Sequence, residues 1–230
     1  MDVAETKDSS TVDTADVARP RKRRIFRMLG LALMLSGIAV MGYPATTFLV
    51  TTKAQDDLRA DWNRLVKEST KNLDSKTSTS TLESSQSAGE SANPSNSKVP
   101  PGKAAFRLIV PKLDLDRIVV KGTDTASLKL GPGHMSKTSQ PGESGVCVVS
   151  GHRTTYGAPF FRLDRLKSGD QIIVETIDYR FTYTVFDIKT VNPKDTSFIS
   201  KTGPPIIALT TCTPIHSARQ RLVVLAKIGE

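Results

Sequence analysis

Short apolar runs dominate the C-terminal half of the chain, residues 103–230, and turn-forming residues separate them. The runs lie at 105–110, 115–120, 146–150, 171–176, 181–188, 206–211 and 222–226. Gly/Pro steps such as Gly131-Pro132 and Gly203-Pro204 stand between them, as turns require. About eight short strands with no long helix between them indicate a closed or nearly closed β-barrel. The predicted fold class is therefore mostly β.

An uncharged apolar stretch precedes this region at residues 28–50. As a helix it spans about 34 Å at about 1.5 Å per residue, which matches a hydrocarbon core of about 30 Å. The basic residues before it are Arg19, Arg21, Lys22, Arg23, Arg24 and Arg27. By the positive-inside rule, this pattern predicts a single-pass membrane protein with a cytoplasmic N-terminus and an extracellular C-terminal domain. A cleavable signal peptide competes with this interpretation, but Tyr43-Pro44-Ala45 lacks the small residues of a cleavage site.

A helical period follows the apolar stretch over residues 53–68, with one apolar face. That face consists of Ala54, Leu58, Trp62, Leu65 and Val66. Trp62 is interpreted as a packing or interface anchor. Residues 69–98 are rich in Ser, Thr, Asn and Lys and predict a flexible tether. The predicted organisation is a cytoplasmic tail (1–27), a transmembrane anchor (28–50), a juxtamembrane helix with linker (51–102) and a globular domain (103–230).

The net charge of +9 does not indicate a nucleic-acid-binding protein. Much of the excess flanks the apolar stretch, and the remaining basic residues are scattered rather than striped. The two cysteines, Cys147 and Cys212, show no metal-ligand spacing with histidine, and no carboxylate cluster indicates a calcium site. The sequence therefore predicts neither a metal nor a cofactor.

Cys212 follows an apolar run and precedes Pro214, so it lies at a predicted strand edge. A free thiol is only about 3% ionised at pH 7 and needs a neighbouring base or cation to act as a nucleophile. A hairpin-like loop over 214–220 would return Arg221 beside it, and His152 and His216 are alternative bases. The residues alone leave three questions open: whether Cys212 is a structural thiol, which histidine is the base, and whether Cys147 forms a disulfide with Cys212. Cys147 lies within an apolar strand, which favours a buried free thiol, and His134 lies in a Gly/Pro loop.

Six motifs occur in a fixed order along the C-terminal domain: RLIVPKL at 107–113, VKGTD at 120–124, GPGH at 131–134, SGHRTTYGAPF at 150–160, LTTCTP at 209–214 and SARQRL at 217–222. By these motifs, residues 103–230 resemble the sortase family of membrane-anchored cysteine transpeptidases. The loop HRTTYGAPF is most similar to class E sortases of actinobacteria. Class C pilin polymerases share the Thr-Cys-Thr-Pro step but commonly carry a C-terminal membrane segment, and the end of the chain at Glu230 favours class E.

The resemblance implies an eight-stranded sortase barrel with Cys212 as nucleophile, His152 as general acid/base and Arg221 as the oxyanion or substrate-positioning residue. Thr211 is implied as a further donor to the oxyanion. The implied reaction cleaves a Leu-Pro/Ala-x-Thr-Gly-like sorting signal of a secreted protein and transfers the protein to an amine of a lipid-linked cell-wall precursor. The alternatives are a class C-like pilin polymerase, an L,D-transpeptidase or cysteine peptidase of the envelope, and a non-catalytic domain that binds wall polymer.

Overall fold

The computed structural model describes the backbone of residues 19–77 and 100–229, and the side chains of 19–24, 39–49 and 72–77 lie outside its described part. The chain divides into two compact units, Met1–Ala45 and Thr46–Glu230. The predicted cytoplasmic residues 1–18 and most of the predicted tether, residues 78–99, lie outside the described residues.

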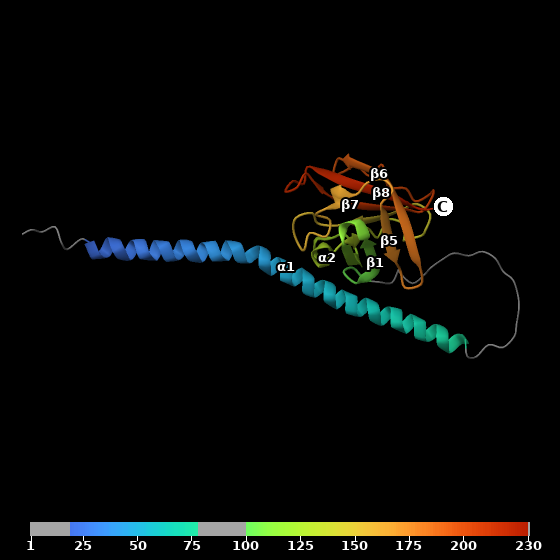
Figure 1. Ribbon diagram of the computed structural model, residues 1–230, viewed down its shortest axis with the longest axis horizontal. Helices are drawn as coiled ribbons and strands as arrows, with labels where there is room; N and C mark the ends of the chain where they lie inside the picture. The colour runs from blue at the N-terminus through green and yellow to red at the C-terminus, as the bar shows by residue number, and fades with distance from the viewer. Residues whose placement is uncertain (1–18, 78–99, 230) are drawn as a thin grey trace, which may run out of the picture. The chain divides into compact units, whose positions relative to one another are not determined.

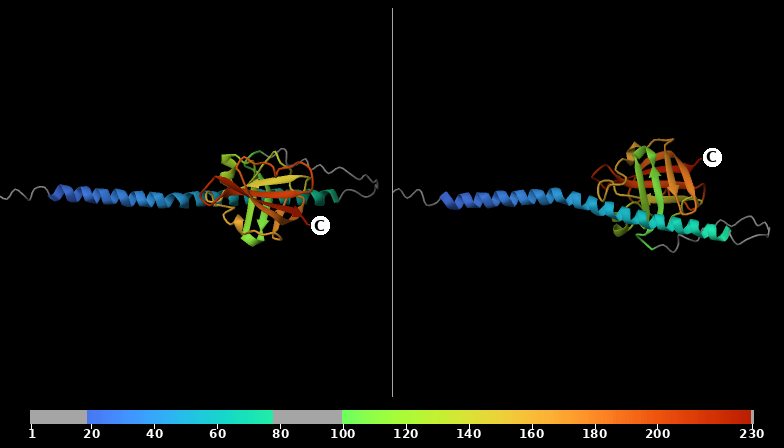
Figure 2. Two further views of the ribbon diagram at one scale, coloured as in Figure 1. Left: turned by 90° about the horizontal axis from the view of Figure 1, so that it is seen from above. Right: turned by 60° about the horizontal axis from the view of Figure 1, so that its bottom comes forward.

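Eight strands close into one barrel in the order β1-β2-β3-β4-β7-β8-β6-β5 (Figures 1 and 2). The strands are β1 (Ala104–Val110), β2 (Leu115–Lys121), β3 (Gly133–His134), β4 (Val146–Ser150), β5 (Gln171–Glu175), β6 (Arg180–Val191), β7 (Ile206–Thr213) and β8 (Gln220–Ile228). The predicted eight-stranded, mostly β fold is thus confirmed. The strand that the apolar pattern missed is β3, because two residues are too short to show a period of two.

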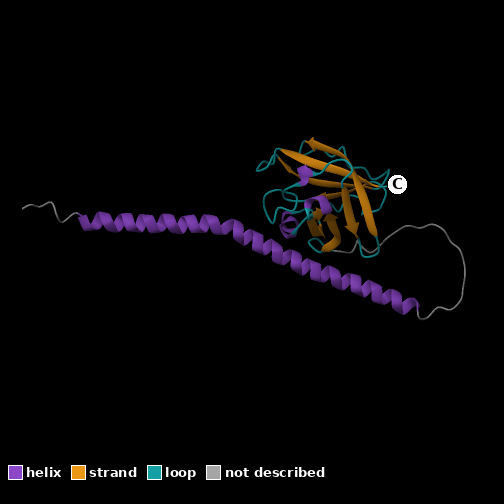
Figure 3. Ribbon diagram, viewed as in Figure 1, coloured by secondary structure: helices purple, strands orange, loops and turns teal. Residues whose placement is uncertain are grey.

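Between the strands of the barrel, helical structure is confined to short segments (Figure 3). These are η2 (Pro111–Leu113), α2 (Thr125–Leu130) and η3 (Leu163–Arg165). The Asp124 carboxylate caps α2 by accepting hydrogen bonds from the backbone N–H groups of Ala126 and Ser127, both at 3.0 Å. The short segment α2 therefore has a defined start on the rim of the barrel.

The parallel pair β4 and β7 is buried on both faces. Cys147 points into the main core, whereas Val146 and Val148 pack with Ala208 in a second apolar cluster on the other face. Strands covered on both sides have no polar alternation, which is why these two read as continuous apolar runs. The pair is consequently a rigid support for the residues that follow its C-terminal ends.

Helix α1 runs from Arg19 to Thr77 without interruption. It includes the predicted helix at 53–68 but continues past Ser69, where the sequence predicts the tether to begin. The chain also stays helical through Pro44. Within the part of the chain that the structure describes, no helix is both long enough and apolar enough to cross a membrane, and the side chains of residues 39–49 in the predicted span lie outside that part.

The portion of α1 in the barrel unit is packed against the barrel. Leu58 and Trp62 are 6% and 4% exposed and belong to the same core cluster as the strands, and Val66 packs beside them. The interpretation of Trp62 as a packing residue is confirmed. Leu65, by contrast, is exposed. The apolar period at 53–66 thus marks a helix that is part of the barrel's core.

Polar contacts tie α1 to strand β2. Gln55 donates from Nε2 to the carbonyl of Ile118 at 3.1 Å and accepts from the N–H of Ile118 at 3.0 Å. The β2–β3 pairing covers only Val120 and Lys121, so on the side of β2 away from β1 no described strand pairs with Ile118. The amide of Gln55 takes the place of such a strand, because it satisfies both backbone groups of Ile118. Gln55 also donates to the carbonyl of Leu130, at the C-terminus of α2, at 2.9 Å.

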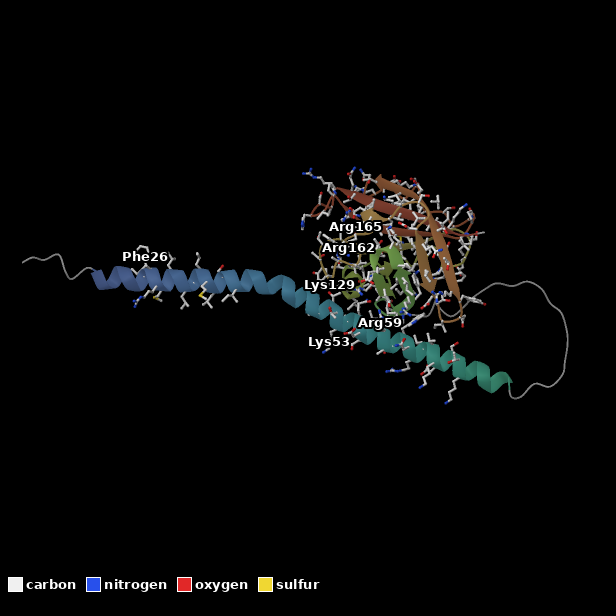
Figure 4. The ribbon with its side chains drawn as sticks, viewed as in Figure 1. Phe26, Lys53, Arg59, Lys129, Arg162 and Arg165 are labelled. Atoms are coloured by element: carbon white, nitrogen blue, oxygen red, sulfur yellow. The ribbon has the colours of Figure 1, made fainter. Side chains whose placement is uncertain are left out.

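An ion-pair cluster lies next to this contact. Arg59 of α1 donates to the Asp116 carboxylate at 3.0 Å, and Arg107 of β1 binds the same carboxylate at 2.7 Å. Hydrogen bonds from Arg107 and then Arg59 lower the pKa of Asp116 to about 2. Figure 4 labels Arg59 where α1 passes the barrel. Apolar packing, the hydrogen bonds of the Gln55 amide and the ion pair of Arg59 with Asp116 therefore hold α1 against the barrel.

We expect Gln55→Ala to lower the free energy of unfolding by about 3 kcal/mol, because it leaves buried backbone groups of Ile118 and Leu130 without partners. The measurement is urea unfolding of the full-length chain, followed by the fluorescence of Trp62, the single tryptophan. Asp57→Ala, on an exposed position of the same helix, is the matched control. A Gln55→Ala variant as stable as Asp57→Ala would show that α1 is not part of the folded unit.

Candidate active site

Cys212 and Arg221 face each other across the hairpin of β7 and β8. The two residues are direct partners in the antiparallel register, and Thr211 pairs with Leu222 one step inward. Side chains of directly paired residues project on the same face, with Cβ atoms about 5 Å apart. Cys212 is a free, partly exposed thiol. The predicted return of Arg221 beside Cys212 is therefore observed.

His152 is brought to the same rim by the parallel pairing of β4 with β7, whose register ends at Ser150 and Thr210. One residue further, the Gly151 N–H donates to the Thr210 carbonyl at 3.0 Å. The Thr211 hydroxyl in turn donates to the Gly151 carbonyl at 2.8 Å. Because parallel strands end at the same edge of a sheet, the segments that carry His152 and Cys212 lie next to each other at this edge.

The Thr211 hydroxyl makes a contact within the protein in the described arrangement. The side chain is 2% exposed, and its single O–H proton is donated to Gly151. This contact joins the strand that carries the cysteine to the segment that carries the histidine. The structure therefore gives Thr211 a supporting contact within the site.

The imidazole of His152 is half-buried against the ring of Tyr156, with ring centroids 5.0 Å apart. Burial lowers the pKa of His152 from its ordinary value, which favours the neutral imidazole. Its Nε2 is buried and has no hydrogen-bond partner among the described residues. A neutral imidazole with a free nitrogen can accept a proton, as a general base must.

The loop that carries His152 is tightly folded. Tyr156, Gly157 and Ala158 all have positive φ values, of 50°, 71° and 42°. Gly157 lies against helix α1, since a Cβ placed there would be 3.0 Å from Cγ2 of Thr51. Lys129 of α2 lies over the Tyr156 ring at 5.7 Å. The loop conformation therefore depends on contacts with both helices.

The guanidinium of Arg221 is oriented by its own turn. Its Nη1 donates to the carbonyls of Ala218 and Gln220, both at 3.1 Å. A guanidinium has five N–H donors, so these contacts fix its direction while other N–H groups remain for a substrate oxygen. The arrangement supplies a fixed positive charge next to Cys212.

His216, His134 and Cys147 are the remaining candidates from the sequence. His216 is exposed in the loop between β7 and β8, and no described hydrogen bond or ring contact links it to Cys212. His134 is 1% exposed, and its Nε2 lies 3.1 Å from the Ser139 carbonyl. Cys147 and Cys212 are both free, so the disulfide alternative is wrong. Burial raises the pKa of the Cys147 thiol, which makes it inert.

Arg153 is the residue at this site that the sequence analysis did not single out. Its guanidinium donates to the Thr213 hydroxyl at 3.2 Å and makes a longer contact of 3.5 Å with the Cys212 carbonyl. It also pairs with Asp164 at 3.0 Å. Its place directly after His152 in the SGHRTTYGAPF motif was the available signal. Within the described residues, no group of three or more His, Cys, Asp or Glu could hold a metal ion.

The protein-family model of the sortase domain matches residues 108–228 of the sequence, which is more than half of the chain. The chain belongs to the sortase family. Sortases are cysteine transpeptidases that act on sorting-signal substrates and cell-wall precursors, and they are generally associated with the membrane at the cell surface.

Named sortases match over different shares of the chain. Sortase D of Bacillus subtilis is 29% identical over 206 residues, which cover 87% of this chain and 98% of that protein. Sortase SrtE1 of Streptomyces coelicolor is 34% identical over 146 residues, which cover 56% of this chain and 42% of that protein. Both relatives are named as sortases, which agrees with the family assignment.

Solved sortases share the barrel fold. The structure of the Clostridium perfringens Sortase D5 transpeptidase has a TM-score of 0.59 at 22% identity, with 79% of this chain and 99% of that chain covered. Sortase E1 of Streptomyces coelicolor, crystallised with a tripeptide in the active site, has a TM-score of 0.53 at 31% identity. That match covers 57% of this chain and 91% of the other.

Proposed function

We propose that this sortase cleaves a Leu-Pro/Ala-x-Thr-Gly-like sorting signal between Thr and Gly and transfers the protein to an amine of a lipid-linked peptidoglycan precursor. Cys212 is the nucleophile, His152 the general acid/base and Arg221 the residue that stabilises the oxyanion. The observation that carries this proposal is the direct pairing of Cys212 with Arg221 at the rim where the His152 segment ends.

The first half of the reaction forms a thioester. The Cys212 sulfur attacks the carbonyl carbon of the Thr residue, and its proton passes to the neutral imidazole of His152. The carbonyl oxygen becomes an oxyanion beside Arg221, where the guanidinium stabilises it. When the tetrahedral intermediate collapses, the C–N bond breaks and His152 gives its proton to the departing Gly amine.

The second half reverses the proton movement. The amine of the acceptor attacks the thioester carbon, and His152 accepts a proton from it. The C–S bond then breaks, and the departing Cys212 sulfur takes that proton from His152, which restores the thiol and the neutral imidazole. No redox step occurs, and the reaction balances with the sorting signal and the acceptor amine as its only substrates.

A single-pass anchor is part of the same proposal. The uncharged residues 28–50 after a basic block support a membrane helix with the barrel outside the cell. Confinement at the membrane would raise the effective concentration of a lipid-linked acceptor. The loop at 152–160 supports class E, and the match to Sortase D makes class D the alternative.

The test is to trap the thioester. The full-length chain, purified in mild detergent, is mixed with Leu-Pro-x-Thr-Gly and Leu-Ala-x-Thr-Gly peptides without an acceptor amine. Mass spectrometry of the acidified, digested protein is expected to find the acyl group on the peptide that contains Cys212, and added amine is expected to release it as the ligated product. No adduct with any signal peptide, or an adduct on Cys147, would overturn the proposal.

A further inference from the structure

Arg153 is the only side chain among the described residues that is both buried and permanently charged. Its side chain is 5% exposed, whereas that of its partner Asp164 is 53% exposed. Burying a guanidinium is costly unless all its donors are paired. Here the Nε of Arg153 is buried and has no hydrogen-bond partner in the described part of the chain. The pairing of this arginine is thus incomplete.

Fold stability gives no sufficient reason for this arginine. An apolar side chain of similar length would fill the same space without an unsatisfied donor, and such replacements of buried ion pairs are often neutral or stabilising. Asp164 could lose its partner at little cost, because half of its side chain is in solvent. A buried polar atom left unpaired in a native fold requires another explanation.

The contacts of Arg153 join three segments that meet at the site. It follows His152 in the chain, and it reaches the Cys212 carbonyl and the Thr213 hydroxyl at the end of β7. Its other branch pairs with Asp164 of η3. The regular β4–β7 pairing ends at Ser150, so Arg153 continues the connection beyond the last ladder hydrogen bonds.

We propose that Arg153 is a positioning residue: its buried guanidinium holds the loop that carries His152 against the strand end that carries Cys212. This inference rests on the proposed function of the two residues that it joins. Because Arg153 is buried, we assign it a role that acts through His152 and Cys212 and not through contact with the substrate. Proton transfer requires heavy atoms about 3 Å apart, and a displacement of about 1 Å can reduce turnover by about 100-fold.

The variants separate positioning from stability. Arg153→Met is expected to lower kcat by about 100-fold and to change KM by less than about threefold, with little change in the thermal midpoint. Arg153→Lys keeps the positive charge but loses the planar guanidinium with its several N–H donors. We therefore expect an intermediate fall in kcat of about tenfold. Arg162→Met is the matched control, because Arg162 is exposed on the same loop and makes no ion pair among the described residues (Figure 4). It should keep kcat within about twofold of wild type.

A second measurement does not depend on turnover. Treatment with S-methyl methanethiosulfonate caps Cys212, whereas Cys147 is buried. In the wild type and in Arg162→Met, capping is expected to shift the side-chain NMR resonances of His152. In Arg153→Met the shift should fall to less than half. This measurement decides the inference even if the wild type forms no thioester, an outcome that would overturn the proposed function alone.

The inference is overturned if Arg153→Met retains wild-type kcat, or if capping of Cys212 shifts His152 equally in Arg153→Met and Arg162→Met. It is also overturned if the thermal midpoint of Arg153→Met falls and the loss of activity disappears at lower temperature. That result would assign Arg153 to the stability of the fold.

Discussion

Cys212→Ala is expected to reduce transpeptidation by at least about four orders of magnitude, to the level of the uncatalysed reaction. The sulfur is the atom that forms the bond to the substrate, and no other nucleophile in the described contacts of the site could replace it. His152 and Arg221 remain in this variant, but they stabilise steps that no longer occur. The fold should be unaffected, because Cys212 lies partly exposed at the end of β7.

Cys147→Ala is the matched control, since it removes the other thiol of the chain. Cys147 is 1% exposed in the core, so this variant should lose some stability through a small cavity but retain kcat. The measurement is the rate of ligation of a sorting-signal peptide to an amine, at equal concentrations of folded protein. If Cys147→Ala is inactive and Cys212→Ala is active, the assignment of the nucleophile is wrong.

Arg221→Ala is expected to lower kcat/KM by about 100- to 1,000-fold, the usual effect of removing one donor to an oxyanion. The loss should appear mainly in kcat, because the negative charge is present in the transition state and absent from the bound substrate. Arg221 is the direct strand partner of Cys212, and its backbone contacts with Ala218 and Gln220 hold it there before substrate binds.

His216→Ala tests the same assignment from the other side. His216 lies in the loop between Cys212 and Arg221 and is exposed, so its replacement should keep kcat/KM within about threefold. Steady-state kinetics of both variants with one signal peptide provide the comparison. A large loss in His216→Ala with normal activity in Arg221→Ala would reverse the roles given to these residues.

Local pattern was sufficient for most of the barrel. Apolar runs and Gly/Pro breaks locate the long strands, because a strand that lines a core must present apolar side chains whatever its neighbours are. The pattern failed where the signal was short or not local. Strand β3 has two residues, and Gln55 reads as an ordinary polar position on a helix. That Gln55 completes the edge of β2 follows only from the pairing of distant strands.

The site was recognised from the sequence only in part. Motifs named Cys212, His152 and Arg221, but the residues alone left His152 and His216 open and allowed a disulfide. The parallel register of β4 and β7 brings the His152 segment to the Cys212 edge, and the two thiols are free. The SGHRTTYGAPF motif contains Arg153 but does not indicate its role, because burial and contacts with residues about sixty positions away leave no trace in local sequence.

By itself, the sequence determined the mostly β barrel, the membership of the sortase family and the three side chains proposed for the reaction. These properties depend on apolar periodicity and on the identity of reactive groups, both of which are local. The tertiary structure decided which residues meet: α1 with the edge of β2, Thr211 with Gly151, and Arg153 with the end of β7. Such contacts join residues far apart in the chain, so only the strand pairing of the closed barrel fixes them.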